Sequence, residues 1–458
     1  MSRILPAIFI FVILGPLQAQ QPSALPQPTP VSVHASEGPG DAFQFTKVDN
    51  ELRAEADAID AQYEKSGMVF HDPGLQAYID SVGSRVLGGR PVPEKVTYRF
   101  LVLNDPSVNA FALPNGSVYI TTGLLALLEN EAQLAGVLGH ETAHVYERHA
   151  YLQNRSMRKK TVATEIIAAA AACVPGGYAS WLAATATANV STLLLVESVY
   201  GYSRELESQA DRDGLEAMTV AGYNPHAVAA TFELLDQDRT LEYEPHPTFY
   251  HDHPSLIKRQ EEALAFADAH TPANARTGLE KDYVTAVAPA IVSSIDADLE
   301  SRRLRTAVAR ATRLVEAFPG DPQYQVLLGE SYRALGAKTA VPSYDETPAG
   351  ENQARNEVLK MTEQDEQKAL LKTSLGQEML KENQAKAEKA FLAAIQSSPQ
   401  YAPAFRELGF LYQDESRFAN AVVNYKHYLQ LVADTSLDRL RITRRLAEVE
   451  KLQAALPH

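Results

Sequence analysis

The string GHETAHVYERH, which begins at Gly139, constrains the fold of this chain more than any other feature of the sequence. On a helix, His140 and His144 lie four residues apart and project from one face, so both imidazoles can reach one metal ion. Glu141 lies beside them, where its carboxylate can take a proton from a water molecule at the metal. The string ends an amphipathic stretch that follows a β segment. The sequence therefore predicts a helix that carries two metal ligands and a general base.

A catalytic zinc ion needs a third protein ligand and an open fourth position. His149 follows His140 by nine residues, so a continuous helix, at about 100° per residue, turns it to the opposite face. Its spacing also misses the pattern His-Glu-x-x-His-x-x-Gly-x-x-His, which excludes a metzincin-type site. The segment SRELESQAD instead places Glu207 and Asp211 four apart on a predicted helix. Because Glu207 and Asp211 share a helix face, we expect Glu207 to complete the site and Asp211 to hold the outer nitrogen of a ligand histidine. Glu205 is the competing carboxylate, but it points to a different face.

The part of the chain around these motifs is expected to be an α+β domain, with helices around a small sheet. Apolar residues recur at helical spacing in some stretches, and β-branched and aromatic residues gather in others. Helices are expected at residues 45–66, 72–87 and 123–150, the last divided near Asn130, and extended segments at 96–104 and 117–121, with a turn at 113–116.

The N-terminus has the organisation of a cleaved secretory signal peptide over residues 1–19. A short positive segment is followed by an apolar run over residues 4–17, which is short for a transmembrane helix. Ala19 is a small residue at the position where a signal peptidase would cut. Residues 20–44 are rich in Pro, Ser and Gln and are expected to form a disordered linker. We expect the chain to work outside the cytoplasm.

Charge and cysteine content exclude several kinds of site and partner. Lys and Arg total 42 against 57 Asp and Glu, a net charge of -15, so nucleic acid is an unfavourable partner. The single cysteine, Cys173, excludes a disulfide framework and a cysteine-built metal site, and it is expected to be an inert core residue.

An apolar, Ala-rich stretch occupies residues 161–200 and is divided by Pro175-Gly176-Gly177. Its first half is too short to cross a bilayer. Two interpretations remain open. The stretch forms either two buried helices over the active-site helix, which we favour, or a hairpin that dips into a membrane.

The tail, residues 284–458, carries a 34-residue repeat typical of tetratricopeptide (TPR) helix pairs. Small residues at fixed positions let the paired helices approach closely, and the register breaks between residues 336 and 367. We expect about four repeats that stack into an all-α solenoid with a concave face. The positions that define the register are Ala307, Leu314 and Pro319; Leu328, Gly329 and Tyr332; Ala387, Phe391, Ala394 and Pro399; and Leu408, Gly409, Tyr412, Ala421 and Tyr425.

Four segments together resemble the successive motifs of the CAAX-protease/HtpX-type family of zinc metallopeptidases. The signal peptide and the repeat tail resemble its BepA-like branch in Gram-negative periplasms. The resemblance covers about residues 45–265 and implies a zincin-like metalloprotease domain over residues 45–272 with one Zn2+ per chain. The segments are NAFALPNGSVYITTGLL from Asn109, NEAQLAGVLGHETAHVYERH from Asn130, SRELESQAD from Ser203 and HPSLIKR from His253.

Three details follow from this resemblance. The family pattern Glu-x-x-Ala-Asp falls on Glu207, Ala210 and Asp211, which agrees with the spacing argument. The family's Pro-Gly-Gly turn is Pro114-Asn115-Gly116 here, and we expect the turn to persist because Asn tolerates positive φ. The pattern His-Pro-x-x-x-x-Arg falls on His253, Pro254 and Arg259.

The segment Asn109, Ala110, Phe111 and Ala112 resembles the edge strand on which such enzymes align an extended substrate. A free strand edge can bind a peptide through backbone hydrogen bonds, although Phe111 could equally be a core residue. His253 follows His246 and His251 in a histidine-rich loop. We expect it to face the zinc, either to stabilise the oxyanion or to plug the open position, with helix capping as the alternative.

The expected function is that of a periplasmic zinc metalloendopeptidase that hydrolyses unfolded or misassembled envelope proteins. The repeat tail would recruit the substrate or dock on an outer-membrane assembly machine, and peripheral membrane association stays open. The alternative is a repeat-based chaperone or scaffold with weak or self-inhibited proteolysis.

Overall fold

The computed structural model describes residues 43–159, 202–241, 256–337, 374–433 and 436–455. Its first helices begin and end where local signals place them. α1 (Lys47–Ser66) starts with a capping box between Thr46 and Asp49, and Gly67 ends it at a φ of 72°. α2 (Pro73–Leu87) starts at Asp72, which accepts a hydrogen bond from the backbone of Leu75. Both predicted helices are confirmed.

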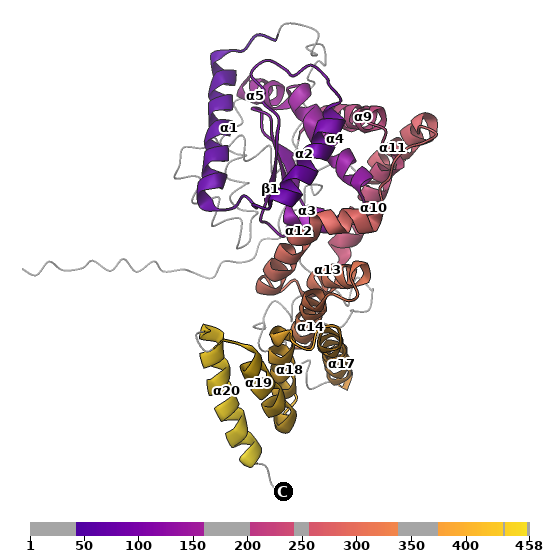
Figure 1. The fold of residues 1–458 in the computed structure, drawn as a ribbon. Helices are drawn as coiled ribbons and strands as arrows, with labels where there is room; N and C mark the ends of the chain where they lie inside the picture. The colour runs from indigo at the N-terminus through magenta and orange to yellow at the C-terminus, as the bar shows by residue number, and fades with distance from the viewer. Residues whose placement is uncertain (1–42, 160–201, 242–255, 338–373, 434–435, 456–458) are drawn as a thin grey trace, which may run out of the picture.

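The sheet has three strands in the order β1-β3-β2, and helices surround it (Figure 1). β1 (Arg99–Leu103) pairs in parallel with β3 (Ser117–Thr121), and β2 (Ala110–Ala112) pairs antiparallel with β3. β2 therefore lies at an edge of the described sheet. The small α+β arrangement expected from the sequence is confirmed.

The turn between β2 and β3 is preserved, but for a different reason from the one expected. Gly116 adopts the positive φ, at 103°, whereas Asn115 does not. The Asn115 side chain instead donates hydrogen bonds of 2.8 and 2.7 Å to Asp57 and Asp60 of α1. An asparagine in this turn thus fastens the hairpin to α1, which glycine could not do.

The helical stretch after the sheet is divided twice. α3 (Thr122–Leu127) and α4 (Glu131–Tyr146) are separated near Asn130, as predicted. α4 then ends before Arg148, whose φ is 59°, and α5 (His149–Lys159) starts in a new direction. The expectation of one helix through His149 is therefore wrong, because the helical spacing that would turn His149 to the opposite face does not extend past Tyr146.

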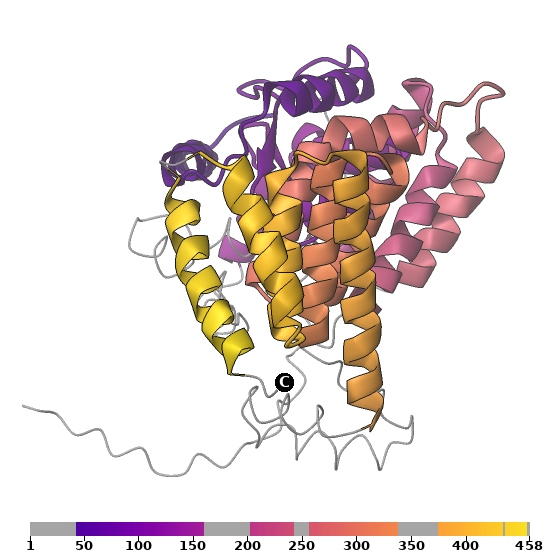
Figure 2. The same cartoon turned by 60° about the horizontal axis from the view of Figure 1, so that its bottom comes forward.

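Helices make up the rest of the described chain, and consecutive helices from α12 to α14 and from α17 to α20 pack side by side. The helices from α12 onward extend away from the sheet in Figure 1, and Figure 2 shows their stacking from below. The helices of this part of the chain are α9 (Arg204–Val220), α10 (His226–Leu241), α11 (Leu256–His270), α12 (Glu280–Glu300), α13 (Leu304–Ala317), α14 (Pro322–Ala337), α17 (Ser374–Ser397), α18 (Ala402–Asp414), α19 (Phe418–Leu431) and α20 (Leu437–Ala454).

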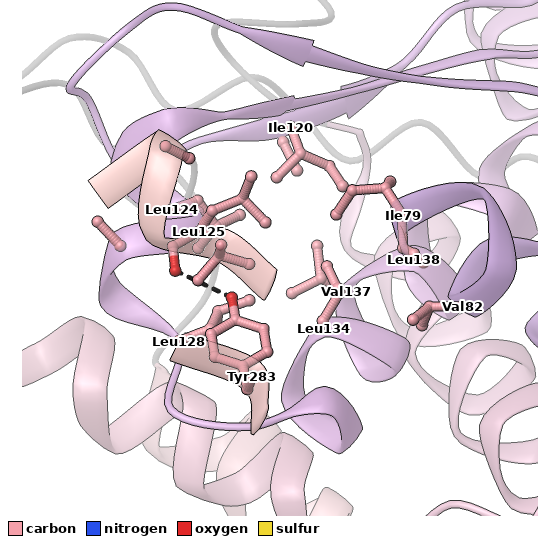
Figure 3. Close-up of a cluster of buried hydrophobic side chains, with 14 of the residues drawn as sticks. Ile79, Val82, Ile120, Leu124, Leu125, Leu128, Leu134, Val137, Leu138 and Tyr283 are labelled. Carbon is pink, nitrogen blue, oxygen red and sulfur yellow. Dashed lines mark hydrogen bonds between the residues drawn. The ribbon is translucent and has the colours of Figure 1, made fainter. Parts of the chain in front are cut away.

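The largest hydrophobic core joins α2, α4 and the sheet to α12 and α13. Tyr283 of α12 is 1% exposed, and its hydroxyl donates a 2.9 Å hydrogen bond to the carbonyl of Leu125 in α3 (Figure 3). A second core lies among α14 and α17–α20, and a third lies under α1. The first helices of the tail therefore share a core with the motif-bearing part of the chain.

Two helix pairs of the tail meet through the same kind of contact. A Cβ on Gly329 of α14 would lie 2.3 Å from the ring of Phe391 in α17, and a Cβ on Gly409 of α18 would lie 2.4 Å from the ring of Tyr425 in α19. In each pair a glycine of the first helix lets an aromatic ring of the second pack against the backbone. The close approach that motivated the repeat interpretation is present at both positions.

Several predictions lie outside the described residues. They are the signal peptide at 1–19, nearly all of the linker at 20–44, the Ala-rich stretch at 161–200 with Cys173, the loop with His246, His251 and His253, and most of the register break after residue 336. Across the described ranges, the helices are too short or too polar to cross a bilayer.

Candidate metal centre

The helix that carries His140 and His144 is anchored at its N-terminus by polar contacts. Asn130 caps α4 by accepting from the backbone of Gln133, and Glu131 adds a negative charge to the first turn. Glu131 accepts hydrogen bonds of 2.6 Å from Arg85 and 2.7 Å from Tyr223. Almost every later residue of α4 is buried, so the two histidines project inside the protein rather than into solvent.

A close helix crossing brings the third side chain to the histidines. A Cβ on Gly139 of α4 would lie 2.8 Å from the carbonyl oxygen of Gly214 in α9, and a Cβ on Gly214 would lie 2.7 Å from the backbone nitrogen of His140. Any larger residue at either position would push the helices apart. The two glycines thus set the separation at which α9 can present Glu207 to α4.

His140, His144 and Glu207 converge as the sequence predicted. One possible ligand atom from each lies within 4.8 Å of the others, and all three side chains are buried. Nε2 of His140 lies 3.5 Å and Nε2 of His144 lies 3.6 Å from a carboxylate oxygen of Glu207. Two imidazole nitrogens and one carboxylate oxygen form the ligand set of a catalytic zinc site, so these residues fit that metal.

Asp211 holds the outer nitrogen of His140, as expected. Its Oδ1 lies 2.9 Å from Nδ1 of His140, while Arg259 of α11 donates two hydrogen bonds of 2.6 and 2.7 Å to the same carboxylate. Burial alone would raise the pKa of Asp211, but Arg259 and His140 outweigh it and hold that pKa well below its usual range. The carboxylate therefore stays charged and orients the His140 ring.

His149 also lies at the site, although its spacing from His140 predicted the opposite. Its Nδ1 lies 2.9 Å from Nδ1 of His144, so it occupies the outer side of that ring, away from Glu207. Tyr202 stacks on His144 with ring centroids 4.1 Å apart. Burial lowers the pKa of His149 to about 4, against the opposing effect of Gln209, so the imidazole is neutral near pH 7.

Glu141 is 2% exposed, and its Oε1 has no hydrogen-bond partner within the described ranges. Burial raises its pKa to about 7; His140 opposes this shift, and Glu207 reinforces it. A carboxylate with a pKa near neutrality can both accept and release a proton, which suits a general base.

Comparison with known proteins places this arrangement in a family. Residues 73–267 match the model described as Peptidase family M48, and this range contains His140, His144, Glu207 and Glu141. Residues 73–267 form a domain of peptidase family M48. The expected metallopeptidase family is confirmed for this range.

Relatives of the M48 domain carry two kinds of name. A "Putative beta-barrel assembly-enhancing protease" of Vibrio cholerae is 29% identical over 251 residues, which cover 55% of this chain and 51% of that protein. The beta-barrel assembly-enhancing protease of Escherichia coli is 28% identical over 201 residues, covering 42% and 39%. The mitochondrial metalloendopeptidase OMA1 of Schizosaccharomyces pombe is 28% identical over 197 residues, covering 42% and 54%. The chain thus spans about half or less of the length of these relatives.

The expected substrate strand borders the helix of the M48 domain that carries the histidines. β2 contacts α4, and Ala110 and Ala112 alternate with Phe111 along it. The Phe111 ring stacks on Tyr119 at 5.1 Å between centroids, inside the core under α1. Phe111 is therefore a core residue, the second of the two interpretations left open by the sequence. Asn109 precedes the strand and pairs with Thr121.

Sequence reasoning missed the roles of Arg259, His149 and the glycine pair in the M48 domain. Arg259 stood in a quoted motif, and its two bonds to Asp211 explain why an arginine occurs there. Gly139 adjoins the His-Glu string, and a glycine inside an otherwise regular helix is a signal of close packing. Nothing in the sequence around His149 indicates that it reaches the site, because its position depends on the helix break at Arg148.

Proposed function

We propose that this chain is a zinc metalloendopeptidase whose single zinc ion is held by His140, His144 and Glu207. The observation that carries the proposal is the buried convergence of these three side chains beside Glu141 in an M48 domain. The chemistry of two imidazoles and one carboxylate favours zinc over harder cations, which prefer oxygen ligands alone.

Each residue then has a task in peptide hydrolysis. A bound zinc ion supplies a Lewis acid that polarises a carbonyl and lowers the pKa of water. Glu141 accepts a proton from the attacking water and delivers it to the leaving amine. Asp211 keeps the His140 ring in the orientation that directs Nε2 inward, as the 2.9 Å contact at Nδ1 requires.

The substrate is proposed to bind as an extended strand along β2. Residues 109–112 lie at the edge of the described sheet and next to α4, so a peptide added there would pass close to the histidines. Because Phe111 points into the core, recognition would use backbone groups and place little demand on the peptide's sequence. Unfolded or misassembled proteins, which offer extended segments, are the substrate class that this mode favours.

The deciding experiment compares cleavage of an unfolded model protein by the mature chain and by its Glu141→Gln variant, with the zinc content measured in both. We expect the variant to retain zinc and to lose activity by about 10²–10⁴-fold, the usual contribution of a general base. Comparable cleavage by both proteins would contradict the assignment of Glu141. No zinc in the wild-type chain would contradict the metal site itself.

The cellular setting is proposed from the sequence and from the printed names of relatives. A cleaved signal peptide at residues 1–19 would deliver the chain to the periplasm, where envelope proteins would be its substrates, and peripheral contact with the membrane is compatible with that place. Relatives from Vibrio cholerae and Escherichia coli are named for enhancing beta-barrel assembly, which suits docking on an outer-membrane assembly machine. We assign that docking to the tail.

The tail is proposed to be a short TPR solenoid over residues 284–458. The repeated contact between a glycine and an aromatic ring, at Gly329 with Phe391 and at Gly409 with Tyr425, supports it. This stack also favours a second function, that of a chaperone or scaffold for envelope proteins. The two functions predict different effects of mutation. Glu141→Gln abolishes a protease function, whereas a scaffold function is lost only when the tail is deleted.

His253 belongs to the proposal as a residue that faces the zinc, although it lies outside the described ranges. A His253→Ala variant separates its two possible tasks. Higher proteolysis indicates that the imidazole plugs the open position, and lower proteolysis indicates oxyanion stabilisation. Unchanged proteolysis would remove His253 from the site and leave helix capping.

A further inference from the structure

His144 and His140 are held on their outer sides by different chemistry. Asp211, a charged carboxylate, contacts Nδ1 of His140, while a second imidazole, that of His149, contacts Nδ1 of His144 at 2.9 Å. His149 is fully buried at the first residue of α5. The break at Arg148 is what returns His149 toward α4.

The contact between the two rings fixes their tautomers. Nε2 of His144 faces Glu207, so metal binding there leaves the proton on Nδ1, which must donate. Nδ1 of His149 must then accept, and its own proton resides on Nε2. That nitrogen lies 3.4 Å from Oε1 of Gln209, the acceptor this tautomer needs.

The line of hydrogen bonds ends at a carboxyl group. Nε2 of Gln209 donates a 2.9 Å hydrogen bond to Oε2 of Glu147, the residue that caps the C-terminus of α4. Gln209 lies two residues from Glu207 on α9. The line therefore connects the helix of His144 to the helix of Glu207. Its hydrogen bonds can all run in one direction, from His144 through His149 and Gln209 to the accepting oxygen of Glu147.

We propose that His149 is a positioning residue that holds His144 in the tautomer and orientation required for metal binding, with Gln209 and Glu147 as its supports. This inference rests on the proposed metal site. It predicts that removing the acceptor at His149 weakens zinc binding even though His149 does not touch the metal. Mutation of a residue that holds a metal ligand in this way typically lowers metal affinity about 10–100-fold.

The test measures the zinc dissociation constant of the full mature chain by competition with a chelator. His149→Phe keeps an aromatic ring but removes the acceptor, and His149→Asn restores an amide oxygen close to the position of Nδ1. His226→Phe is the matched control, because His226 lies on α10 with Asn224 and Asp268 as its partners. The visible spectrum of the cobalt(II)-substituted proteins provides a second readout of ligand geometry.

We expect His149→Phe to weaken zinc binding about 10–100-fold and to change the cobalt spectrum, and His149→Asn to stay within about threefold of the wild type. The control should be unchanged. Equal zinc affinity of His149→Phe and the wild type would overturn the proposal, and so would equal losses in the Phe and Asn variants.

A folding defect in His149→Phe would appear as a lower thermal unfolding temperature of the metal-free chain. Gln209→Leu then decides, because it leaves both rings in place. A several-fold loss of zinc affinity in Gln209→Leu supports the proposal, and an unchanged affinity overturns it. A wild-type chain without zinc affinity would contradict the proposed function itself, which keeps the two failures apart.

Discussion

Glu330 of α14 shows how a partly buried carboxylate outside the metal centre responds to its surroundings. Burial raises its pKa to about 7, and Glu407 of α18 adds to the shift. Arg406 and Arg333 act in the opposite direction, and Arg333 also donates a 3.1 Å hydrogen bond to Glu407. Two carboxylates thus share two guanidinium groups at the junction of these helices, and one carboxylate tends to keep its proton.

This arrangement predicts a stability that depends on pH. The folded-state pKa of Glu330 lies above its unfolded value of 4.5, so folding favours the protonated form. The penalty for ionisation is absent below about pH 4.5, grows as the pH rises toward 7, and is complete above that value. Glu330→Gln should therefore raise the free energy of unfolding by about 1–3 kcal/mol at pH 8 and leave it unchanged at pH 4.

Urea unfolding at the two pH values measures this difference. Glu448→Gln serves as the control, because it makes the same chemical change at an exposed position on α20. A Glu330→Gln variant that is less stable than the wild type at pH 8 would show that the ion pairs of Glu330 outweigh its burial.

At the residue scale, the sequence predicted that His140, His144, Glu207 and Asp211 come together, but it did not predict the positions of His149 and Asn115. His140, His144, Glu207 and Asp211 depend on spacing within single helices, which periodicity reveals. His149 reaches the site only because Arg148 adopts a positive φ, and Asn115 acts through contacts with α1, far away in sequence. Long-range contacts of this kind leave no mark in local spacing.

At the element scale, an ion cluster joins the tail to the sheet. Asp298 of α12 is fully buried and pairs with Arg303 and Arg310. Both arginines also donate to the carbonyl of Pro106, and Arg310 donates to that of Gly123. These carbonyls lie in the loop between β1 and β2 and at the start of α3. The helices after residue 280 thus hold the segment that leads into the proposed substrate strand.

We expect Arg310→Met to lower the free energy of unfolding by about 2–4 kcal/mol, because it leaves buried carbonyls and part of the Asp298 charge without partners. Proteolysis should show a raised KM, since the loop before residues 109–112 loses a fixed point. Thermal unfolding and cleavage kinetics measure the two effects. Arg441→Met, at a mostly exposed arginine, should change stability by less than about 0.5 kcal/mol. An Arg310 variant that resembles this control would contradict the role of the cluster.

Element boundaries were predictable where a cap or a turn marks them. Asp72, Asn130 and the glycines at 67 and 88 begin or end helices at the expected places. The predicted extended segment at 96–104 shortens to β1 because only residues 99–103 have a partner in β3. Pairing, which the sequence does not display, decides the length of a strand.

At the scale of the whole molecule, the largest core crosses the predicted border between the two domains. Residues of α12 and α13 are buried together with those of α2, α3 and α4. Figure 3 shows Tyr283 of α12 among side chains of α2, α3 and α4. Six of the residues that α12 contributes are fully buried: Tyr283, Val284, Val287, Ala290, Ile291 and Ile295. The predicted boundaries at 272 and 284 remain a prediction, and this core argues that the first tail helices belong to the folding unit of the M48 domain.

The distribution of the core predicts how shortened chains behave. A piece of residues 43–272 should be insoluble or unfolded, because it lacks the side chains of α12 that fill the core. A piece of residues 43–337 should fold and bind zinc. Circular dichroism and zinc content of the two pieces check this expectation. A folded, zinc-binding piece ending at residue 272 would show that the motif-bearing part is independent of the tail.

The shared core also affects how such a tail can be exchanged between related proteins. If α12 and α13 came from a different parent than α3 and α4, Tyr283 would meet an unmatched cavity and the arginines of the ion cluster would face foreign carbonyls. A workable chimera would keep residues 43–337 from one parent and join the new helices beyond α14. The junction for grafting new specificity onto this chain thus lies among the tail helices, well after the residues that match the M48 family.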